Sequence, residues 1–245
     1  MEQLKIVYIN LEHRKDRREQ IEKELINIPK ENILLKTSPS EPHSPCVIRT
    51  QENILLPSPM EERRSLLEQS SRGNIHRIDA VYYPKNGPLG CCVSHIKAIE
   101  LAIKNKWDKV LILEDDFVFI NKELTNDLLN RFYELKINWN VLMFSSNLIK
   151  SEKTEFDFLN KVIEGKTTSG YLLNSNYYHI LLQNFKECFD VLNVPIYSKK
   201  LKGSCIDMGW RKLQPGSDWY ITNPKIGKQN EGFSDIMNQY KKYDC

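Results

Sequence analysis

Short apolar runs alternate with longer segments of helical periodicity along most of this 245-residue chain. The runs are rich in β-branched and aromatic residues, which indicates strands, while the segments between them indicate helices. We expect strands over residues 5–10, 31–36, 74–81, 109–120, 141–145, 161–163, 167–173 and 219–222, and helices over 14–26, 61–69, 90–105, 122–135 and 175–192. Because strands and helices alternate, the pattern predicts an α/β fold with a mostly parallel central sheet.

Three stretches interrupt this alternation. Residues 37–59 are rich in proline and serine and predict a long irregular loop or an insertion. Residues 146–155 are polar and predict a second loop, and the short strand at 161–163 is expected at an edge of the sheet. The chain after Pro195 is irregular, and its tail, residues 223–236, is loop-like and rich in hydrogen-bonding groups.

The apolar run from Val110 to Leu113 leads directly into three acids, Glu114, Asp115 and Asp116. A buried strand of this kind places the acids at its carboxyl end, where open α/β sheets bind ligands. Three adjacent carboxylates repel one another, and Mg²⁺ or Mn²⁺ with a bound diphosphate would neutralise them. Strand alternation would turn Glu114 and Asp116 to one side and Asp115 to the other. The alternative is an exposed strand end with solvated acids.

A basic cluster, Arg14, Lys15, Arg17 and Arg18, follows the first predicted strand. Positive side chains at the start of a helix, together with its free N–H groups, suit an anion. A solvated helix face is the alternative. The residues alone leave both interpretations open.

The helix predicted over residues 90–105 carries Ser94 and His95 in its first turns, on the same face as Cys91. The helix dipole favours an anion at this position. A histidine on such a face serves either as a core residue or as a ligand-binding one. Near the other end of the chain, Asp207 is an isolated acid among apolar neighbours, so it is a candidate general base, a helix N-cap, or both.

Composition narrows the class of protein only moderately. The charged fraction is 27%, the hydrophobic fraction 40% and the formal net charge +3, so nothing indicates a nucleic-acid-binding protein. The six cysteines form no CxxC pair or zinc pattern, which favours reduced thiols. The sequence has no apolar run of transmembrane length and no signal-peptide pattern, so we expect a cytoplasmic chain or a domain of a longer one.

Several stretches, taken together and in order, resemble glycosyltransferase family 25, which comprises lipopolysaccharide-type glycosyltransferases and collagen galactosyltransferases. YINLEHRKDR is similar to the family's YxINLxxRxDR, and IDAV followed by GCCVSH is similar to its DAV…GCxxSH. LILEDD matches the acidic motif, and Asp207 with NPKIGKQNEGFSDI resembles the carboxyl-terminal elements. The resemblance extends from about Lys5 to Ile236.

The resemblance implies a GT-A-type Rossmann-like domain. We expect a single domain over residues 1–245, with the irregular loop or insertion near 37–59 and an ordered C-terminal tail. The resemblance implies transfer of a hexose, commonly galactose or glucose, from a UDP-sugar to a hydroxyl of a glycan or protein acceptor. The family is grouped as inverting and uses a divalent metal, Mn²⁺ or Mg²⁺. The partners expected are therefore a nucleotide-sugar donor and an acceptor, with no nucleic acid.

The resemblance also implies roles for individual residues. Asp116 matches the carboxylate that binds Mn²⁺, with Glu114 or Asp115 reaching the metal through water or holding the ribose. An inverting transfer needs a base for the acceptor hydroxyl, for which Asp207 is the candidate and Asp218 and Asp235 are alternatives. The nucleotide-side residues would be Asn10, Arg14, Arg17, Ser94 and His95, with Gln229 and Ser234 closing over the diphosphate.

Two departures from the family pattern and two competing functions remain. One departure is the loop at residues 37–59, which is peculiar to this chain and bears on the acceptor. No histidine follows His179, so the carboxyl-terminal histidine ligand of some other GT-A enzymes is absent, and an acid, an amide or water must replace it. A family member that has lost transfer and binds glycans or proteins is one alternative. A metal phosphohydrolase built on the same acids is the other, although the sequence offers no nucleophilic aspartate or second, histidine-rich metal site for it.

Overall fold

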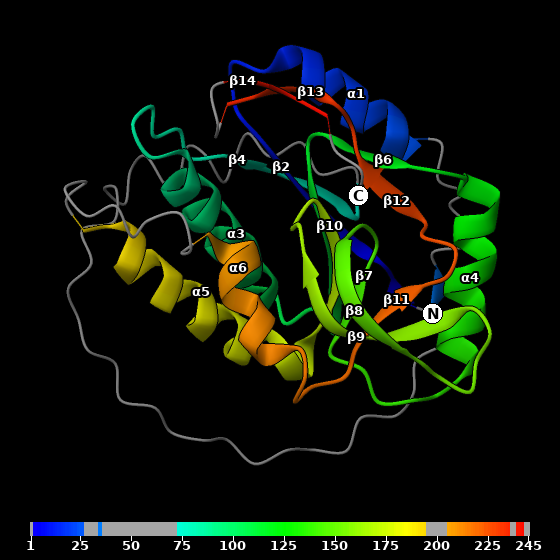
Figure 1. Ribbon diagram of the computed structural model, residues 1–245. Helices are drawn as coiled ribbons and strands as arrows, with labels where there is room; N and C mark the ends of the chain where they lie inside the picture. Colours follow the sequence, from blue (N-terminus) through cyan, green and yellow to red (C-terminus); the bar gives the residue numbers. More distant parts are fainter. Residues whose placement is uncertain (1, 27–33, 36–72, 195–204, 236–238, 243–245) are drawn as a thin grey trace.

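The computed structural model describes residues 2–26, 34–35, 73–194, 205–235 and 239–242. Its centre is an eight-stranded sheet (Figure 1). In spatial order the strands are β4 (Ile75–Asp79), β2 (Lys5–Asn10), β5 (Lys109–Glu114), β10 (Gly170–Asn174), β7 (Val141–Met143), β11 (Trp219–Thr222), β9 (Leu159–Lys166) and β8 (Asn147–Lys153). Only β10 and β9 run against the direction shared by the others. The prediction of an α/β fold with a mostly parallel central sheet is confirmed.

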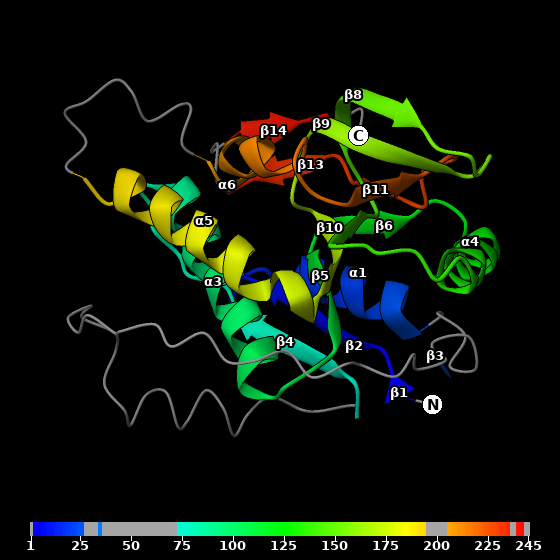
Figure 2. The ribbon, with the colours of Figure 1, turned by 90° about the horizontal axis from the view of Figure 1, so that it is seen from below.

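Helices cover both faces of the sheet (Figures 1 and 2). One face carries α3 (Gly87–Lys104), α5 (Tyr178–Leu192) and the short α6 (Ile206–Gly209), and the other carries α1 (Lys15–Ile26) and α4 (Lys122–Glu134). Side chains alternate along the central strands, so Ile112 packs with the first group of helices and Leu111 with the second. This two-sided burial explains why β5 reads as a continuous apolar run.

Smaller elements complete the fold. They are the strand pairs β1 (Glu2–Gln3) with β3 (Leu34–Leu35), β6 (Phe117–Phe119) with β12 (Gly227–Gln229), and β13 (Gly232–Ser234) with β14 (Gln239–Lys241), and the 3₁₀ turns η2 (Ser175–Tyr177) and η4 (Trp210–Leu213). The β6–β12 pair is held close to the main sheet because Phe117 lies where a Cβ at Gly170 or Gly227 would stand. The polypeptide just after β12 is thereby fixed next to the end of β5.

The strand directions decide where a site can form. β2, β5 and β7 all end at one edge of the sheet, and the reversed β10 begins there, with Gly170 opposite Leu113. The acids after β5 therefore lie at the carboxyl edge, where the sequence predicts a ligand. β11 is parallel to β7 and pairs Trp219 with Val141, so Asp218, which precedes it, lies at the opposite edge.

Several sequence expectations need correction. Residues 146–155 are not a loop, because most of them form β8, and β9 is an inner strand rather than the edge. The strand predicted to continue through residue 120 ends at Glu114, turns, and resumes as β6. The tail contains two short strands, β12 and β13, and α3 begins at Gly87, where Asn86 caps it and Pro88 occupies its first turn. The loop or insertion at 37–59 and the helix at 61–69 lie outside the described residues.

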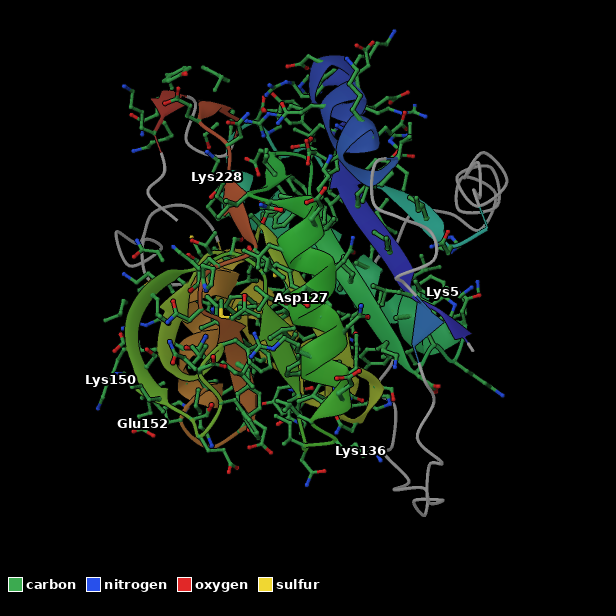
Figure 3. The ribbon with its side chains drawn as sticks, turned by 90° about the vertical axis from the view of Figure 1, so that its right-hand side faces the viewer. Lys5, Asp127, Lys136, Lys150, Glu152 and Lys228 are labelled. Carbon is green, nitrogen blue, oxygen red and sulfur yellow. The ribbon has the colours of Figure 1, made fainter. Side chains whose placement is uncertain are left out.

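Three further features of the described residues concern membrane-spanning helices, cysteine pairing and the exposed edge of the sheet. None of the helices in the described part of the chain is both long enough and apolar enough to cross a membrane. The cysteines among the described residues, Cys91, Cys92, Cys188 and Cys205, are all free thiols. The exposed edge strand β8 carries outward charges, including Lys150 and Glu152 (Figure 3). Charges of this kind disfavour pairing with a strand from another chain.

Candidate functional site

A pocket opens at the carboxyl edge of the sheet, between the end of β5, the start of α3 and the C-terminal tail. The empty space of the pocket, including the part open to solvent, is about 720 Å³. Its floor is formed by the three acids, and one wall by residues 80–83 together with α3. The opposite wall comes from Gln229, Ser234 and Asp235.

Arg17 of α1 joins two of the acids. Its guanidinium Nη1 lies 3.0 Å from Asp115 Oδ1 and 3.2 Å from Asp116 Oδ2. The alternation expected within the triplet is therefore wrong, because the strand ends at Glu114 and both aspartates lie in the turn that follows. Burial raises the pKa of Asp115, and the Arg17 charge opposes that rise. Arg17 thus supplies part of the positive charge that the sequence assigned to a metal.

Asp116 remains incompletely neutralised. Its Oδ2 also accepts a hydrogen bond from Gln229 Nε2 (3.1 Å), while its Oδ1 is buried without a hydrogen-bond partner. Burial, reinforced by repulsion from Glu114 and Asp115 and opposed by Arg17, raises the pKa of Asp116 from 3.8 to about 7. A buried carboxylate oxygen without a partner is an energetic cost that a bound cation would remove.

Glu114 faces a different set of groups. Its Oε1 accepts a hydrogen bond from Thr168 Oγ1 (2.7 Å) and lies 3.3 Å from His95 Nε2. On the far side of the ring, His95 Nδ1 is 2.9 Å from the hydroxyl of Tyr171. Burial acts to raise the pKa of Glu114, but contact with His95, Thr168 and the Arg17 charge outweighs it, so that pKa is lowered. Glu114 is therefore the acid of the triplet that carries charge most readily.

Gly90 and Ser94 shape the wall of the pocket. A Cβ at Gly90 would overlap the carbonyl oxygen of Val81, so only glycine allows α3 to approach the segment after β4. The Ser94 hydroxyl donates to the carbonyl of Gly90 (2.7 Å) and accepts from the N–H of Val81 (2.8 Å). Ser94 lines the pocket, as expected, but its hydrogen bonds hold the wall in place.

The C-terminal tail reaches back to the first helix. The backbone carbonyl of Phe233 accepts a hydrogen bond from Arg17 Nη2 (2.6 Å), and Asp235 forms an ion pair with Arg14. Ser234, between them, lines the pocket. Figure 1 shows the β13–β14 pair lying beside α1. Residues from the two halves of the chain therefore share one pocket.

Two of the predicted nucleotide-side residues lie behind the pocket. Asn10 Nδ2 donates to Asp115 Oδ2 (2.8 Å) and to the carbonyl of Arg14 (3.1 Å), so the amide links the end of β2 to the acids and to the start of α1. The Arg14 guanidinium is engaged by Asp16 and Asp235. Neither residue lines the cavity, in contrast to Arg17.

Asp207 lies next to the pocket but does not line it. It is the second residue of α6, whose N-cap position is Cys205, so the N-cap alternative is wrong. Its Oδ2 accepts a long hydrogen bond from the N–H of Thr167 (3.4 Å), and burial raises its pKa. Of the alternatives, Asp235 lines the pocket, whereas Asp218 at the opposite edge lies 3.6 Å from Lys161.

The sequence did not identify several residues of the pocket. Cys91 lines it, and its place one helical turn before His95 was the available signal. Tyr82 and Tyr83, both exposed at the pocket, lie between the strand predicted over 74–81 and the helix predicted over 90–105. Thr168 and Tyr171 orient Glu114 and His95, but no local pattern predicts that the reversed strand β10 and the residues just before it bring them there.

Comparison with protein families gives one match. Residues 3–196 match the model of glycosyltransferase family 25, described as an LPS biosynthesis protein. No curated protein matches the chain at a significant level.

Three of the solved structures that resemble this fold share little sequence identity with the chain. A glycosyltransferase involved in glycosylation of the major capsid of PBCV-1 has a TM-score of 0.48 and 10% identity, with 97% of each chain covered. A mannose-1-phosphate geranyltransferase from Thermus thermophilus has a TM-score of 0.42 and 8% identity, covering 96% of this chain and 76% of that one. The galactosyltransferase LgtC, in complex with donor and acceptor sugar analogues, has a TM-score of 0.38 and 14% identity over 88% and 73%. Scores this low do not carry a functional argument.

Proposed function

Since the chain belongs to glycosyltransferase family 25, we propose that it transfers a hexose from a UDP-sugar to a hydroxyl of a glycan or protein acceptor, with inversion. The observation that carries the proposal is the pocket at the carboxyl edge of the sheet. Its lining includes the three acids, Arg17 and the tail residues Gln229 and Ser234. Galactose and glucose are the proposed sugars, and the acceptor class includes lipopolysaccharide-type glycans and collagen-like proteins.

Charge distribution supports a diphosphate in this pocket. Arg17 lies at the pocket surface between Asp115, Asp116 and the tail, so its guanidinium can bind a phosphate while still compensating the acids. Ser234 and Gln229 line the facing wall. The exposed rings of Tyr82 and Tyr83 offer apolar surface for a base or sugar.

The residues also fit a divalent cation. Asp116 Oδ1 is a buried carboxylate oxygen without a partner, and oxygen ligands of this kind suit Mn²⁺ or Mg²⁺. Asp116 would hold the ion, with Glu114 as the second proposed ligand. When bound, such an ion supplies electrostatic stabilisation of the departing diphosphate.

Asp207 is the proposed general base. Burial raises its pKa, which makes the carboxylate a better proton acceptor, and it lies in the first turn of α6 beside the pocket. Asp235, by contrast, is occupied by its ion pair with Arg14. The Asp207→Asn variant should retain UDP binding and lose acceptor-dependent UDP release.

The donor site can be tested by thermal-shift titration with UDP, UDP-galactose and UDP-glucose, each with and without Mn²⁺. A ligand that binds only the folded state raises the melting temperature by mass action. We expect a shift that requires both nucleotide and Mn²⁺ and that disappears in Asp116→Ala. Asp218→Ala is the matched control, because Asp218 lies at the opposite edge of the sheet.

The outcomes separate the candidate functions. Absence of any shift in folded wild-type protein would reject the donor site and favour a family member that only binds glycans or proteins. If nucleotide binds, an assay of UDP release distinguishes transfer from hydrolysis. Release that depends on an added acceptor supports transfer, whereas equal release without acceptor supports a phosphohydrolase.

A further inference from the structure

We infer that Cys91, His95 and Glu114 form a second metal site, selective for Zn²⁺ or a similar borderline ion, in the same pocket. It shares Glu114 with the proposed Mn²⁺ position on Asp116 but takes its other ligands from α3, and it does not depend on the transferase proposal. The ligand atoms, one sulphur, one nitrogen and one oxygen, all lie within 4.8 Å of one another. Thiolate, imidazole and carboxylate together are typical ligands of zinc.

The backbone brings these three residues together without distortion. Cys91 and His95 are four residues apart in α3, so their side chains lie one above the other on the same face. Glu114 is the last residue of β5, at the edge against which the start of α3 packs. The helix therefore supplies two ligands and the central strand the third.

The nitrogen that would bind the ion lacks an aligned hydrogen bond. His95 is completely buried, and its Nε2 has no hydrogen-bond partner, although Glu114 Oε1 lies 3.3 Å away. The other ring nitrogen, Nδ1, is held by the Tyr171 hydroxyl at 2.9 Å. An outer contact of this kind fixes the ring orientation of metal-binding histidines. Thr168 fixes Glu114 in the same way, through a hydrogen bond of 2.7 Å.

The separations suit a tetrahedral ion. Zinc bonds of about 2.0–2.3 Å place neighbouring ligand atoms roughly 3.3–3.8 Å apart. The His95–Glu114 separation of 3.3 Å already satisfies this, and the cluster limit of 4.8 Å requires a movement of only about 1 Å. Cys91 and Glu114 line the pocket, so a fourth position would be available to water or a substrate oxygen.

The test is a titration of chelator-treated protein with Co²⁺, which replaces Zn²⁺ and reports its ligands in the absorption spectrum. We expect saturation at one equivalent, with a thiolate-to-cobalt charge-transfer band in the near ultraviolet and visible bands of tetrahedral cobalt. Cys91→Ala should abolish the charge-transfer band, and Glu114→Gln should weaken binding at least about tenfold, or about 1.4 kcal/mol. Addition of Zn²⁺ should displace the cobalt.

Controls distinguish the site from other thiols. Cys92→Ala should keep the band, because the Cys92 sulphur contacts the carbonyl of Phe185. If that variant does not fold by circular dichroism, Cys205→Ala serves the same purpose. A folded wild type without the band, or a band that survives Cys91→Ala, would overturn the inference.

The second metal site and the donor site can be tested independently of each other. Asp116→Ala should lose the shift produced by UDP and Mn²⁺ but keep the cobalt band. A protein that shows the UDP shift without the cobalt band has the donor site and lacks the second metal site. The reverse result would leave the metal site in place and reject the donor site.

Discussion

The oxygen Oδ1 of Asp116 is buried without a hydrogen bond, and this single atom links stability to pH. An unfolded aspartate ionises near pH 3.9, whereas the folded pKa is raised to about 7. The folded state therefore binds more protons between these values. The stability contributed by the protonated carboxyl is fully present below about pH 4 and is lost as the pH rises through 7.

This direction of the pH dependence leads to a prediction for Asp116. In the presence of chelator, Asp116→Asn should raise the free energy of unfolding at pH 8 by about 1–3 kcal/mol, because the amide removes a buried charge. The gain should shrink toward pH 5, where the native carboxyl is already protonated. Urea unfolding at pH 5 and pH 8 measures both values, with Asp218→Asn as the control. A variant less stable than wild type at pH 8 would contradict the raised pKa.

For the individual residues of the pocket, the sequence indicated which ones lie near the site but not which side chains contact one another. The apolar run ending in three acids correctly placed Glu114, Asp115 and Asp116 at the carboxyl end of a central strand. That Arg17 would join two of them depends on how α1 packs beside β5, a contact about one hundred residues apart in the chain. Local patterns contain no information on such a contact.

Among the elements, the position of α3 relative to β4 depends on one glycine. A methyl group at Gly90 would overlap the Val81 carbonyl, which belongs to the backbone and cannot rotate away. Gly90→Ala should therefore destabilise the protein by about 1–3 kcal/mol and weaken ligand binding at the pocket wall. Gly216→Ala, where no atom lies within 4 Å of the added carbon, is the matched control.

Denaturant unfolding of the two glycine variants measures the difference. Equal stability of Gly90→Ala and Gly216→Ala would show that α3 can shift without cost. Thermal-shift titration with UDP then reports whether the displaced wall still binds nucleotide.

The elements that the sequence predicted well are those with strong local signals. Strands β2 and β11 have the predicted bounds, and Asn121 caps α4 as its position suggests. Strand β8 was missed because it lies at the sheet edge and most of its side chains are exposed, so no apolar alternation marks it. The reversed direction of β10 is likewise set by non-local pairing with β5 and β7.

The molecule as a whole builds its pocket from distant parts of the chain. The family match ends at residue 196, yet Gln229, Ser234 and Asp235 form one wall. The motif resemblance predicted that Gln229 and Ser234 belong to the site, and the structure places both at the pocket. The resemblance could not predict the contacts that hold this wall in place. Its ion pair, for example, joins Arg14 to Asp235, which are 221 positions apart in the chain.

A truncation tests the role of this wall. The β13–β14 pair forms its own small sheet, separate from the eight-stranded one. A chain ending at Glu231 should therefore keep its circular dichroism spectrum and most of its thermal stability, but bind UDP about tenfold more weakly, or about 1.4 kcal/mol. Isothermal titration calorimetry measures the affinity, and Asp235→Asn, which keeps the hairpin, is the companion variant. Unchanged affinity after truncation would exclude the hairpin from the nucleotide site.

The residues that form the two pocket walls are far apart in the sequence, so they are synthesised at different times. A ribosome releases Arg17 and the three acids well before Phe233, whose carbonyl completes the Arg17 contacts. Synthesis proceeds at about 5–20 residues per second, so the far wall of the pocket is made several seconds after the three acids. A stalled nascent chain that ends before β13 should therefore bind nucleotide about tenfold more weakly than the released protein, as the truncated chain does.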